Sequence, residues 1–407
     1  MKPVTSCLSL VSLFAFSVSA FAVTCAVPTS GYPTIQAAVD DPTCNTINVG
    51  PGLFPENVSV SRSVVINGAQ AGQPVAGRLS GGPAESIVSG VNPAGPAATF
   101  LVSAPSVTID GFTIKNAVAA GSAMGVEINR ASNDAVVINN FIDGIASTDA
   151  TAAGTAQAVS VHNGVLNVNV GNNDIRNVTS TGNAFGVLLA DDDNLLPDTE
   201  IAYLHHNTVT AISSATGGAA AFVCRKIALT AGNLQISDNI VSGVTGASWA
   251  RGVSLEAHTR VYLVIVNDFA GLSSGSGDVA AVWINNPAGY SGDVGGNNYD
   301  LPPTAFGVKV HFADPQVAAP PLSAGCSWWG SADGPGPVGP GHGCQVSPNV
   351  LFINWRIVPS HQSPCNGSNT PVTEADCKNG GWITHVRADG STFKSQGDCI
   401  QLVNKGK

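Results

Sequence analysis

The sequence predicts an all-β solenoid, in which successive turns of one chain stack as rungs. Six asparagines recur at gaps of 33, 34, 32, 28 and 31 residues, and five of them have an apolar residue two places on. A short alternating strand runs into each asparagine, a residue type that tolerates the left-handed bend of a corner. A sustained period of this length is typical of stacked repeats. The six are Asn140, Asn173, Asn207, Asn239, Asn267 and Asn298.

Composition favours a packed β core over disorder. The 407 residues include 46 glycines and 25 prolines, but 44% are hydrophobic and the period is sustained. The formal net charge is −10. No basic stripe could neutralise phosphates, so we expect no nucleic-acid partner. Beyond the N-terminal segment no apolar run approaches the ~18 residues of a membrane span, so we expect none.

Residues 1–22 have the features of a secretory signal peptide. They contain one basic residue, Lys2, then an apolar stretch from Cys7 to Val18 and a small-x-small cleavage site at Ala20 to Ala22. We therefore expect a secreted protein that is extracellular or periplasmic after cleavage.

Eight cysteines follow residue 22, which fits an oxidising compartment. Three pairs would close loops of about 20 residues, each worth ~3 kcal/mol on the chain-entropy model. The expected pairs are Cys25 with Cys44, Cys326 with Cys344, and Cys377 with Cys399. Cys224 and Cys365 are left, either bonded together or free, because connectivity cannot be deduced from spacing.

The region after the signal peptide begins with a short helix and continues as strands. In "YPTIQAAV", Ile35, Ala38 and Val39 form one helix face. We expect this helix to cap the solenoid, because a bare first rung would expose unpaired backbone and apolar surface. The segments "TINV", "NVSV", "SVVING" and "SVTIDGFTI" alternate with period two and have Gly-rich corners.

This stretch resembles the N-terminal part of the right-handed parallel β-helix proteins of the pectate-lyase-like superfamily. The resemblance lies in "TIQAAV", "INVGPGLFPENV" and "VVINGA". It implies a secreted bacterial protein with a right-handed parallel β-helix over 23–362. Within it we expect a cap over 23–50, rungs over about 51–325 and a closing segment over 326–362. The resemblance indicates a scaffold and does not indicate a substrate.

Each central repeat carries a further strand, such as "GVEINR" or "GVSLEA". Apolar residues at its second and fourth places are expected to fill the core, which turns Cys224 inward as a buried thiol. The fifth and sixth places should stack outside as a column, because neighbouring rungs lie about 4.8 Å apart. The outward third place of one rung holds Trp283, between Ser254 and Lys309. The strands start at Gly125, Ala158, Gly186, Ala221, Gly252, Ala281 and Gly307.

The last part of the chain resembles two known kinds of segment. "CSWWGSADGPGPVGPGHGC" resembles the closing segment of bacterial β-helix repeat proteins, where a Trp pair and a Gly/Pro loop cover the last rung. A linker is expected over 363–373. Residues 374–407 resemble a small Cys-clamped C-terminal unit of secreted bacterial proteins, which at this size would need its disulfide to stay folded.

One functional hypothesis is a scaffold without catalysis that binds a polysaccharide or a cell-surface glycan. Trp283 could stack on a sugar ring if exposed, although a covering loop would bury it equally well. The outer column supplies the polar partners. A purely structural or adhesive surface protein is a third hypothesis. We expect a monomer. The ligand-binding candidates are Asn129, His162, Asp191, Trp283 and Asn285.

The alternative is a Ca²⁺-assisted polysaccharide lyase acting on an acidic polysaccharide. Such an enzyme abstracts a proton next to a uronate carboxylate, which needs cations and a base. Net acidity means that this activity would require the metal. A solvated loop with surface counter-charges accounts for the same residues. The catalytic candidates are Arg225, Lys226, Arg251, Glu256 and His258, and the Ca²⁺ ligands would be Asp191, Asp192 and Asp193.

Two adjacent histidines, His205 and His206, come just before the ladder residue Asn207. Neighbouring side chains in a strand face opposite ways. We therefore expect them to form part of a corner and not a metal pair.

Overall fold

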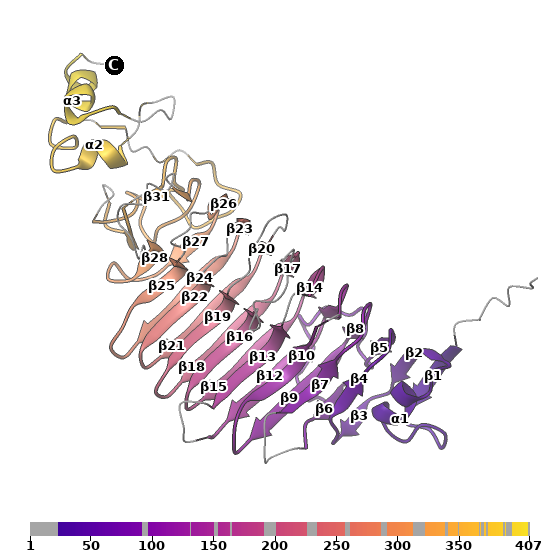
Figure 1. Cartoon of the computed structure of the whole chain (residues 1–407). Coiled ribbons are helices and arrows are strands. Elements are labelled where there is room, and N and C mark those ends of the chain that lie inside the picture. Colours follow the sequence, from indigo (N-terminus) through magenta and orange to yellow (C-terminus); the bar gives the residue numbers. More distant parts are fainter. Residues whose placement is uncertain are drawn as a thin grey trace, which may run out of the picture.

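The chain forms a parallel β-solenoid, shown here by a computed structural model (Figure 1). Each turn passes through three sheets, and every strand pairs in parallel with the strand one turn away. None of the described helices is long and apolar enough to cross a membrane. The described residues are 23–91, 97–130, 132–149, 154–162, 165–190, 201–225, 234–256, 261–285, 291–311, 322–337, 341–348, 350–365, 367, 370–371, 373–385, 387 and 393–405.

The three sheets contain 12, 9 and 10 strands. The 12-stranded sheet consists of β1 (Val23–Val27), β2 (Cys44–Val49), β5 (Val65–Asn67), β8 (Thr108–Asp110), β11 (Val136–Ile138), β14 (Val168–Gly171), β17 (Ala202–His205), β20 (Leu234–Ser237), β23 (Val261–Ile265), β26 (Ser291–Asp293), β29 (Leu322–Ser323) and β31 (Val350–Leu351).

The 9-stranded sheet consists of β3 (Gly52–Phe54), β6 (Ser86–Ser89), β9 (Phe112–Val118), β12 (Phe141–Ser147), β15 (Asp174–Ser180), β18 (Thr208–Ser214), β21 (Ile240–Gly246), β24 (Asp268–Ser274) and β27 (Asn298–Asp300). The 10-stranded sheet consists of β4 (Val58–Val60), β7 (Ala97–Val102), β10 (Ala123–Ile128), β13 (Thr155–His162), β16 (Asn183–Ala190), β19 (Gly218–Arg225), β22 (Trp249–Glu256), β25 (Val279–Asn285), β28 (Phe306–Val310) and β30 (Gln345–Val346).

The predicted inward places of the central strands are confirmed. Val126 and Ile128 on β10 are fully buried, as are the corresponding Val253 and Leu255 on β22, four turns further on in the same sheet. Cys224 points inward and is buried, as predicted. Because one column of apolar side chains from each sheet meets inside every turn, the core runs the whole length of the solenoid.

A ladder of buried asparagines runs from turn to turn between the 12-stranded and 9-stranded sheets. Asn173 Nδ2 donates to Asn207 Oδ1 at 3.0 Å, and the backbone N–H of Asn173 donates to the same oxygen at 3.1 Å. The second amide hydrogen of Asn173 goes to the Val137 carbonyl. The pattern repeats at each step, so every buried amide is satisfied within the ladder, as burial requires. The ladder consists of Asn140, Asn173, Asn207, Asn239, Asn267 and Asn297.

The last ladder position predicted from the period, Asn298, is wrong. Asn297 takes it, and Asn298 instead begins β27 and donates to Asp268 Oδ1 at 2.7 Å. The apolar residue two places on identifies the correct asparagine, because Tyr299 is fully buried.

The left-handed bend also lies one residue earlier than predicted. The residues with positive φ directly precede the ladder asparagines: Asn139, Asn172, His206, Asp238, Val266 and Gly296, with φ between 53° and 71°. The ladder asparagines therefore serve as buried hydrogen-bonding groups, and the preceding residue, which is exposed or half-buried, takes the bend.

The expected capping helix is reduced to α1 (Ile35–Asp40). It buries Ile35, Ala38 and Val39 against the first turn, with Thr34 as its N-cap. A helix that closes the whole N-terminal end is not evident, because β1 itself forms the end of the 12-stranded sheet (Figure 1). The predicted Cys25–Cys44 disulfide joins β1 to β2.

The predicted Cys326–Cys344 pair is wrong. Cys326 bonds Cys365, and Cys344 is a free, buried thiol. Cys344 comes directly before β30, and its side chain points into the last turn and away from Cys326. Its sulfur packs against Gly307, where a Cβ would lie only 2.9 Å from it. Cys326 lies at a bend, with φ 56°, where the returning chain can reach it.

Beyond β31 the chain forms two short helices, α2 (Gly381–Thr384) and α3 (Gln396–Asn404). The predicted Cys377–Cys399 disulfide joins the segment before α2 to α3, in a unit whose small core also contains Phe393.

The ladder makes a stability prediction. Asn207→Ala removes the acceptor of two buried N–H groups of Asn173. Each buried group without a partner costs ~1–3 kcal/mol, so we expect the free energy of unfolding to fall by ~3 kcal/mol in chemical denaturation followed by circular dichroism. Asn48→Ala is the matched control, because Asn48 is an exposed amide on β2 and should cost under ~0.5 kcal/mol. Equal losses in the two variants would contradict a supporting role for the ladder.

The cysteine arrangement makes a chemical prediction. In the chain from Val23 onward, a thiol reagent should find no reactive cysteine in the folded state and two after unfolding, because Cys224 and Cys344 are buried. Burial also raises the pKa of Cys344 to about 12, which keeps it as an unreactive thiol. Peptide mapping should recover a Cys326–Cys365 fragment, whereas a Cys326–Cys344 fragment would contradict this pairing.

Candidate binding face on the 10-stranded sheet

The outward side chains of the 10-stranded sheet gather most of the chemistry predicted from the sequence. Parallel register places Ser254, Trp283 and Lys309 side by side on β22, β25 and β28, as expected. A second outward column places Arg225, Glu256 and Asn285 in register on β19, β22 and β25. Figure 1 shows these strands side by side along the solenoid.

A stack of aromatic rings around one guanidinium forms the centre of this face. The Arg251 Cζ lies 3.5 Å from the ring centroid of Trp283 and 4.3 Å from that of Trp249. Trp283 stacks on His311 with centroids 6.2 Å apart, and Trp249 stacks on Phe185 at 6.3 Å. Desolvated cation–π contacts are worth ~2 kcal/mol, so the stack offsets the cost of burying the charge. We call these five side chains the aromatic–arginine stack.

The stack shows whether the Trp283 ring is exposed to a ligand or covered. The ring projects outward as predicted but is only 8% exposed, because Arg251 lies against it and the His311 ring is stacked beside it. Its ring face is therefore not open to a sugar. The more exposed tryptophan of the stack is Trp249, at the start of β22.

The Glu256 carboxylate pairs with two arginines, Arg251 of the stack and Arg225 beside it. Glu256 Oε2 accepts from Arg225 Nε at 2.8 Å, and Glu256 Oε1 lies 3.5 Å from Arg251 Nη1. Ser254 bridges them: its hydroxyl accepts from Arg251 Nη1 and donates to Glu256 Oε1. Burial lowers the pKa of Arg251 to about 10, and the nearby Glu256 and Asp278 carboxylates partly oppose this shift. Arg251 remains a cation at neutral pH.

Part of the outer face is apolar and buried. Phe185, Leu188, Ala190, Ala220 and Val223 point away from the core and yet are at most 5% exposed, packed together with Trp249. The polar column predicted on this side is therefore interrupted at Ala190. The accessible part of the face lies further along, over β22, β25 and β28.

An open cleft adjoins the accessible part. It has a volume of about 380 Å³ and lies at the corner that leads from the 9-stranded to the 10-stranded sheet, between Leu272 and Phe306. Asp278, on its edge, pairs with Lys309 Nζ at 2.5 Å. The Lys309 Nζ also lies 4.8 Å from the centroid of the Phe306 ring. The Phe306 ring and the Asp278 carboxylate thus line the cleft, and the Lys309 ammonium group lies beside it.

The structure brings some of the predicted site residues together and separates others. Arg225, Arg251, Glu256 and Trp283 form one cluster, and Asn285 lies in register with Glu256. His162 is three turns away from Glu256 along the same column, and its Nε2 lies 2.6 Å from Ser160 Oγ. Asn129 follows β10, one turn further. The remaining candidates, Lys226, His258, Asp191, Asp192 and Asp193, lie outside the described residues.

Sequence reasoning missed several members of this face. Trp249 lies two residues before Arg251, so the strand period alone would have placed both on the outer side. Asp278, Phe306 and His311 gave no such signal, because their neighbours are set by the register between turns and not by spacing within a strand.

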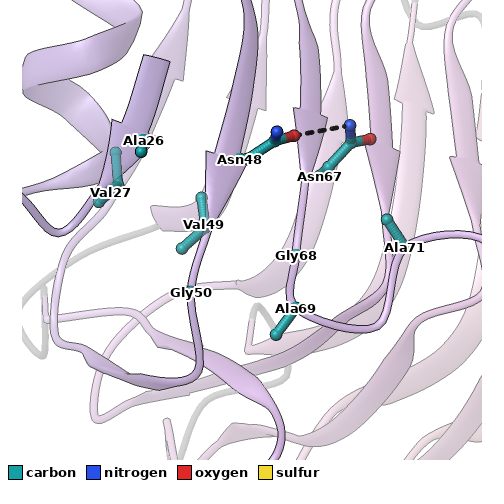
Figure 2. A pocket seen from close by; sticks show the side chains of 9 residues that line it. All are labelled: Ala26, Val27, Asn48, Val49, Gly50, Asn67, Gly68, Ala69 and Ala71. Carbon is teal, nitrogen blue, oxygen red and sulfur yellow. Dashed lines mark hydrogen bonds between the residues drawn. The ribbon is translucent and has the colours of Figure 1, made fainter. Parts of the chain in front are cut away.

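A second cleft lies at the N-terminal turns (Figure 2). It is lined by residues of β1, β2 and β5 and has a volume of about 410 Å³. Its polar side chains are Asn48 and Asn67, and Asn67 Nδ2 donates to Asn48 Oδ1 at 3.1 Å. The lining contains no titratable side chain, so this cleft offers no acid–base chemistry.

No group of three or more metal-ligating side chains occurs within the described part of the chain. No protein-family model, curated protein or solved structure matches this chain. The fold defines the protein as a parallel β-solenoid.

The shared carboxylate makes a prediction about stability. Glu256→Gln leaves Arg251, which is 8% exposed, without its counter-charge, and we expect the unfolding free energy to drop by ~2 kcal/mol. Arg225→Gln removes only a partly exposed partner and should cost under ~1 kcal/mol. Thermal and chemical denaturation of the two variants would check this order. A larger loss for Arg225→Gln would show that Glu256 does not stabilise the buried cation.

Proposed function

We propose that this protein is a secreted β-solenoid scaffold that binds a glycan along the outer face of β22, β25 and β28. The supporting observation is the aromatic–arginine stack with its rim of paired acids and bases. Sugar rings present apolar C–H faces and hydroxyl groups that both donate and accept. The partly exposed rings of Trp249 and Phe306 offer apolar contact, while Arg225, Asp278 and Lys309 offer hydrogen bonds.

The shape of the face favours a polymer over a small ligand. Turns of the solenoid are spaced about 4.8 Å apart, so outward groups repeat along its axis. Both clefts are open surfaces and lack an enclosed cavity of the kind that buries most of a small molecule. A polysaccharide or cell-surface glycan chain lying along the axis would contact several turns at once.

Secretion is part of the same proposal. Three disulfides join described cysteines, and disulfides persist in oxidising compartments. The predicted signal peptide, residues 1–22, lies outside the described residues. A pectate-lyase-like ancestry and a bacterial source fit this setting and the resemblance of the N-terminal segment.

A second candidate is a lyase acting on an acidic polysaccharide. Its supporting observation is Arg251, whose pKa burial lowers to about 10, in the direction needed for a basic catalyst. Against it, Arg251 is 8% exposed, and both Arg225 and Arg251 face Glu256. An arginine held by a carboxylate and two rings is poorly placed to take a proton from substrate. We therefore favour binding without catalysis.

Binding can be tested with the rim residues, which lie outside the stack. The mature protein would be titrated with pectate, alginate and glycosaminoglycan fragments by calorimetry. Phe306→Ala should weaken binding about tenfold, because an aromatic contact is worth up to ~1.5 kcal/mol beyond its area. Tyr203→Ala is the matched control, since Tyr203 is an exposed aromatic, 39% exposed, on the 12-stranded sheet.

The same samples separate the two functions. New ultraviolet absorbance from unsaturated uronate products, formed with Ca²⁺ and lost in Arg251→Lys, would establish the lyase and overturn the preference for binding alone. Retained binding without new absorbance supports the scaffold. Failure of all the glycans to bind would leave a structural or adhesive role.

A further inference from the structure

Two adjacent histidines meet at a corner between the 12-stranded and 9-stranded sheets. His205 Nδ1 and His206 Nδ1 lie 3.0 Å apart, with the rings edge to face at 86°. The expectation that they face opposite ways is wrong here. His206 takes the left-handed bend, with φ 53°, and the strand alternation of side chains ends at that residue.

The His205 ring is oriented before any ligand arrives. Its Nε2 lies 3.0 Å from Asn169 Oδ1 on the neighbouring strand β14, and an amide oxygen only accepts hydrogen bonds. The ring hydrogen of His205 is therefore on Nε2, and its Nδ1 accepts a hydrogen bond from the Nδ1–H of His206. A metal ion would replace this hydrogen bond once the His206 hydrogen has moved to Nε2. The Nε2–H···O contact of His205 is that of most metal-binding histidines, which donate the other ring N–H to an oxygen acceptor.

A glycine makes room for that ring. Gly171 is the register partner of His205 on β14, and a Cβ at Gly171 would lie 2.5 Å from His205 Cε1. The imidazole lies directly over the glycine. Any larger residue at position 171 would move the ring and with it the Nδ1 atom.

The spacing of the two nitrogens fits one metal ion. Metal–imidazole bonds are about 2.0–2.1 Å long, so two nitrogens 3.0 Å apart subtend about 94° at a shared ion. Such a cis angle suits a tetragonal ion such as Cu²⁺ better than a tetrahedral one.

We propose that His205 and His206 form a chelating site for a divalent transition metal, with Cu²⁺ bound more tightly than Zn²⁺ and Ca²⁺ not bound. Exposed Asp238 takes the same bend on the next turn, with φ 56°. Within the described residues no third metal-ligating side chain joins the pair, so water would complete the coordination. The site is on a different side of the solenoid from the glycan face and does not depend on it.

The neighbouring turns supply variants that should fold normally. Asn139 and Asn172 hold the same bend as His206, with φ 55°, so His206→Asn keeps a residue suited to it. Ser237 is the register partner of His205 on β20, so His205→Ser copies the adjacent turn. The control is His342→Ala, which removes a histidine that has an 89% exposed side chain and pairs with Asp333.

The experiment is a calorimetric titration of the mature chain, without any histidine tag, with Cu²⁺, Zn²⁺ and Ca²⁺ in turn, and an electron paramagnetic resonance spectrum of the Cu²⁺ form. We expect one Cu²⁺ per chain, weaker Zn²⁺ binding, no heat with Ca²⁺, and coupling of the copper to two nitrogens. Each of His205→Ser and His206→Asn should weaken Cu²⁺ binding at least tenfold, and Gly171→Ala should weaken it as well, because it displaces the ring.

The His342→Ala control should bind Cu²⁺ like the unchanged chain. Cu²⁺ affinity that survives both substitutions at the pair would overturn the site, as would equal loss in the control. Coupling to a single nitrogen would show that the two histidines do not act as a chelate. Circular dichroism of each variant establishes that a loss of binding is not a loss of fold.

Discussion

The structure depends on hydrogen bonding between successive turns, and above all on the buried asparagine ladder. Backbone pairing alone would let the turns of a solenoid slide or spread at the corners. The ladder closes one corner by giving each amide oxygen from Asn173 onward two donors from the preceding turn. Because the backbone N–H and one amide hydrogen of each asparagine are satisfied by the next asparagine, a missing member leaves buried groups of its neighbour unpaired. The ladder begins at the N–H of Phe112 and ends at Ser327.

At each corner, two adjacent residues therefore meet different structural requirements. The ladder asparagine must be buried and must hydrogen-bond on both sides. The residue before it only has to adopt a positive φ, and it faces solvent, so its chemistry can vary from Asn to Asp, His, Val or Gly. The histidine pair arises from this freedom. His206 occupies a bend where most turns hold a small polar residue, and there it meets the last side chain of the preceding strand.

The outer face of the 10-stranded sheet shows how a solenoid can hold charge on a largely apolar frame. Arg251 is placed between two tryptophan rings, and its charge is balanced by Glu256, which also serves Arg225. The stack extends across several turns of the sheet, since Phe185 lies on β16, Trp249 on β22 and Trp283 on β25. Such a face is rigid, with polar groups at its rim and few free charges, which favours binding over proton transfer.

The sequence by itself determined the class of fold, the inward and outward places of the strands and two of the three disulfides. It could do so because strand alternation and a repeat period are local properties that persist along the chain. It also placed Arg225, Glu256 and Trp283 on one side. Only the tertiary structure decided that Arg251 covers Trp283, that Cys326 reaches Cys365, that Asn297 takes the ladder position, and that His205 and His206 face each other. Each of these depends on register between turns or on one left-handed residue, and a one-residue difference in either redirects a side chain without any change in local pattern.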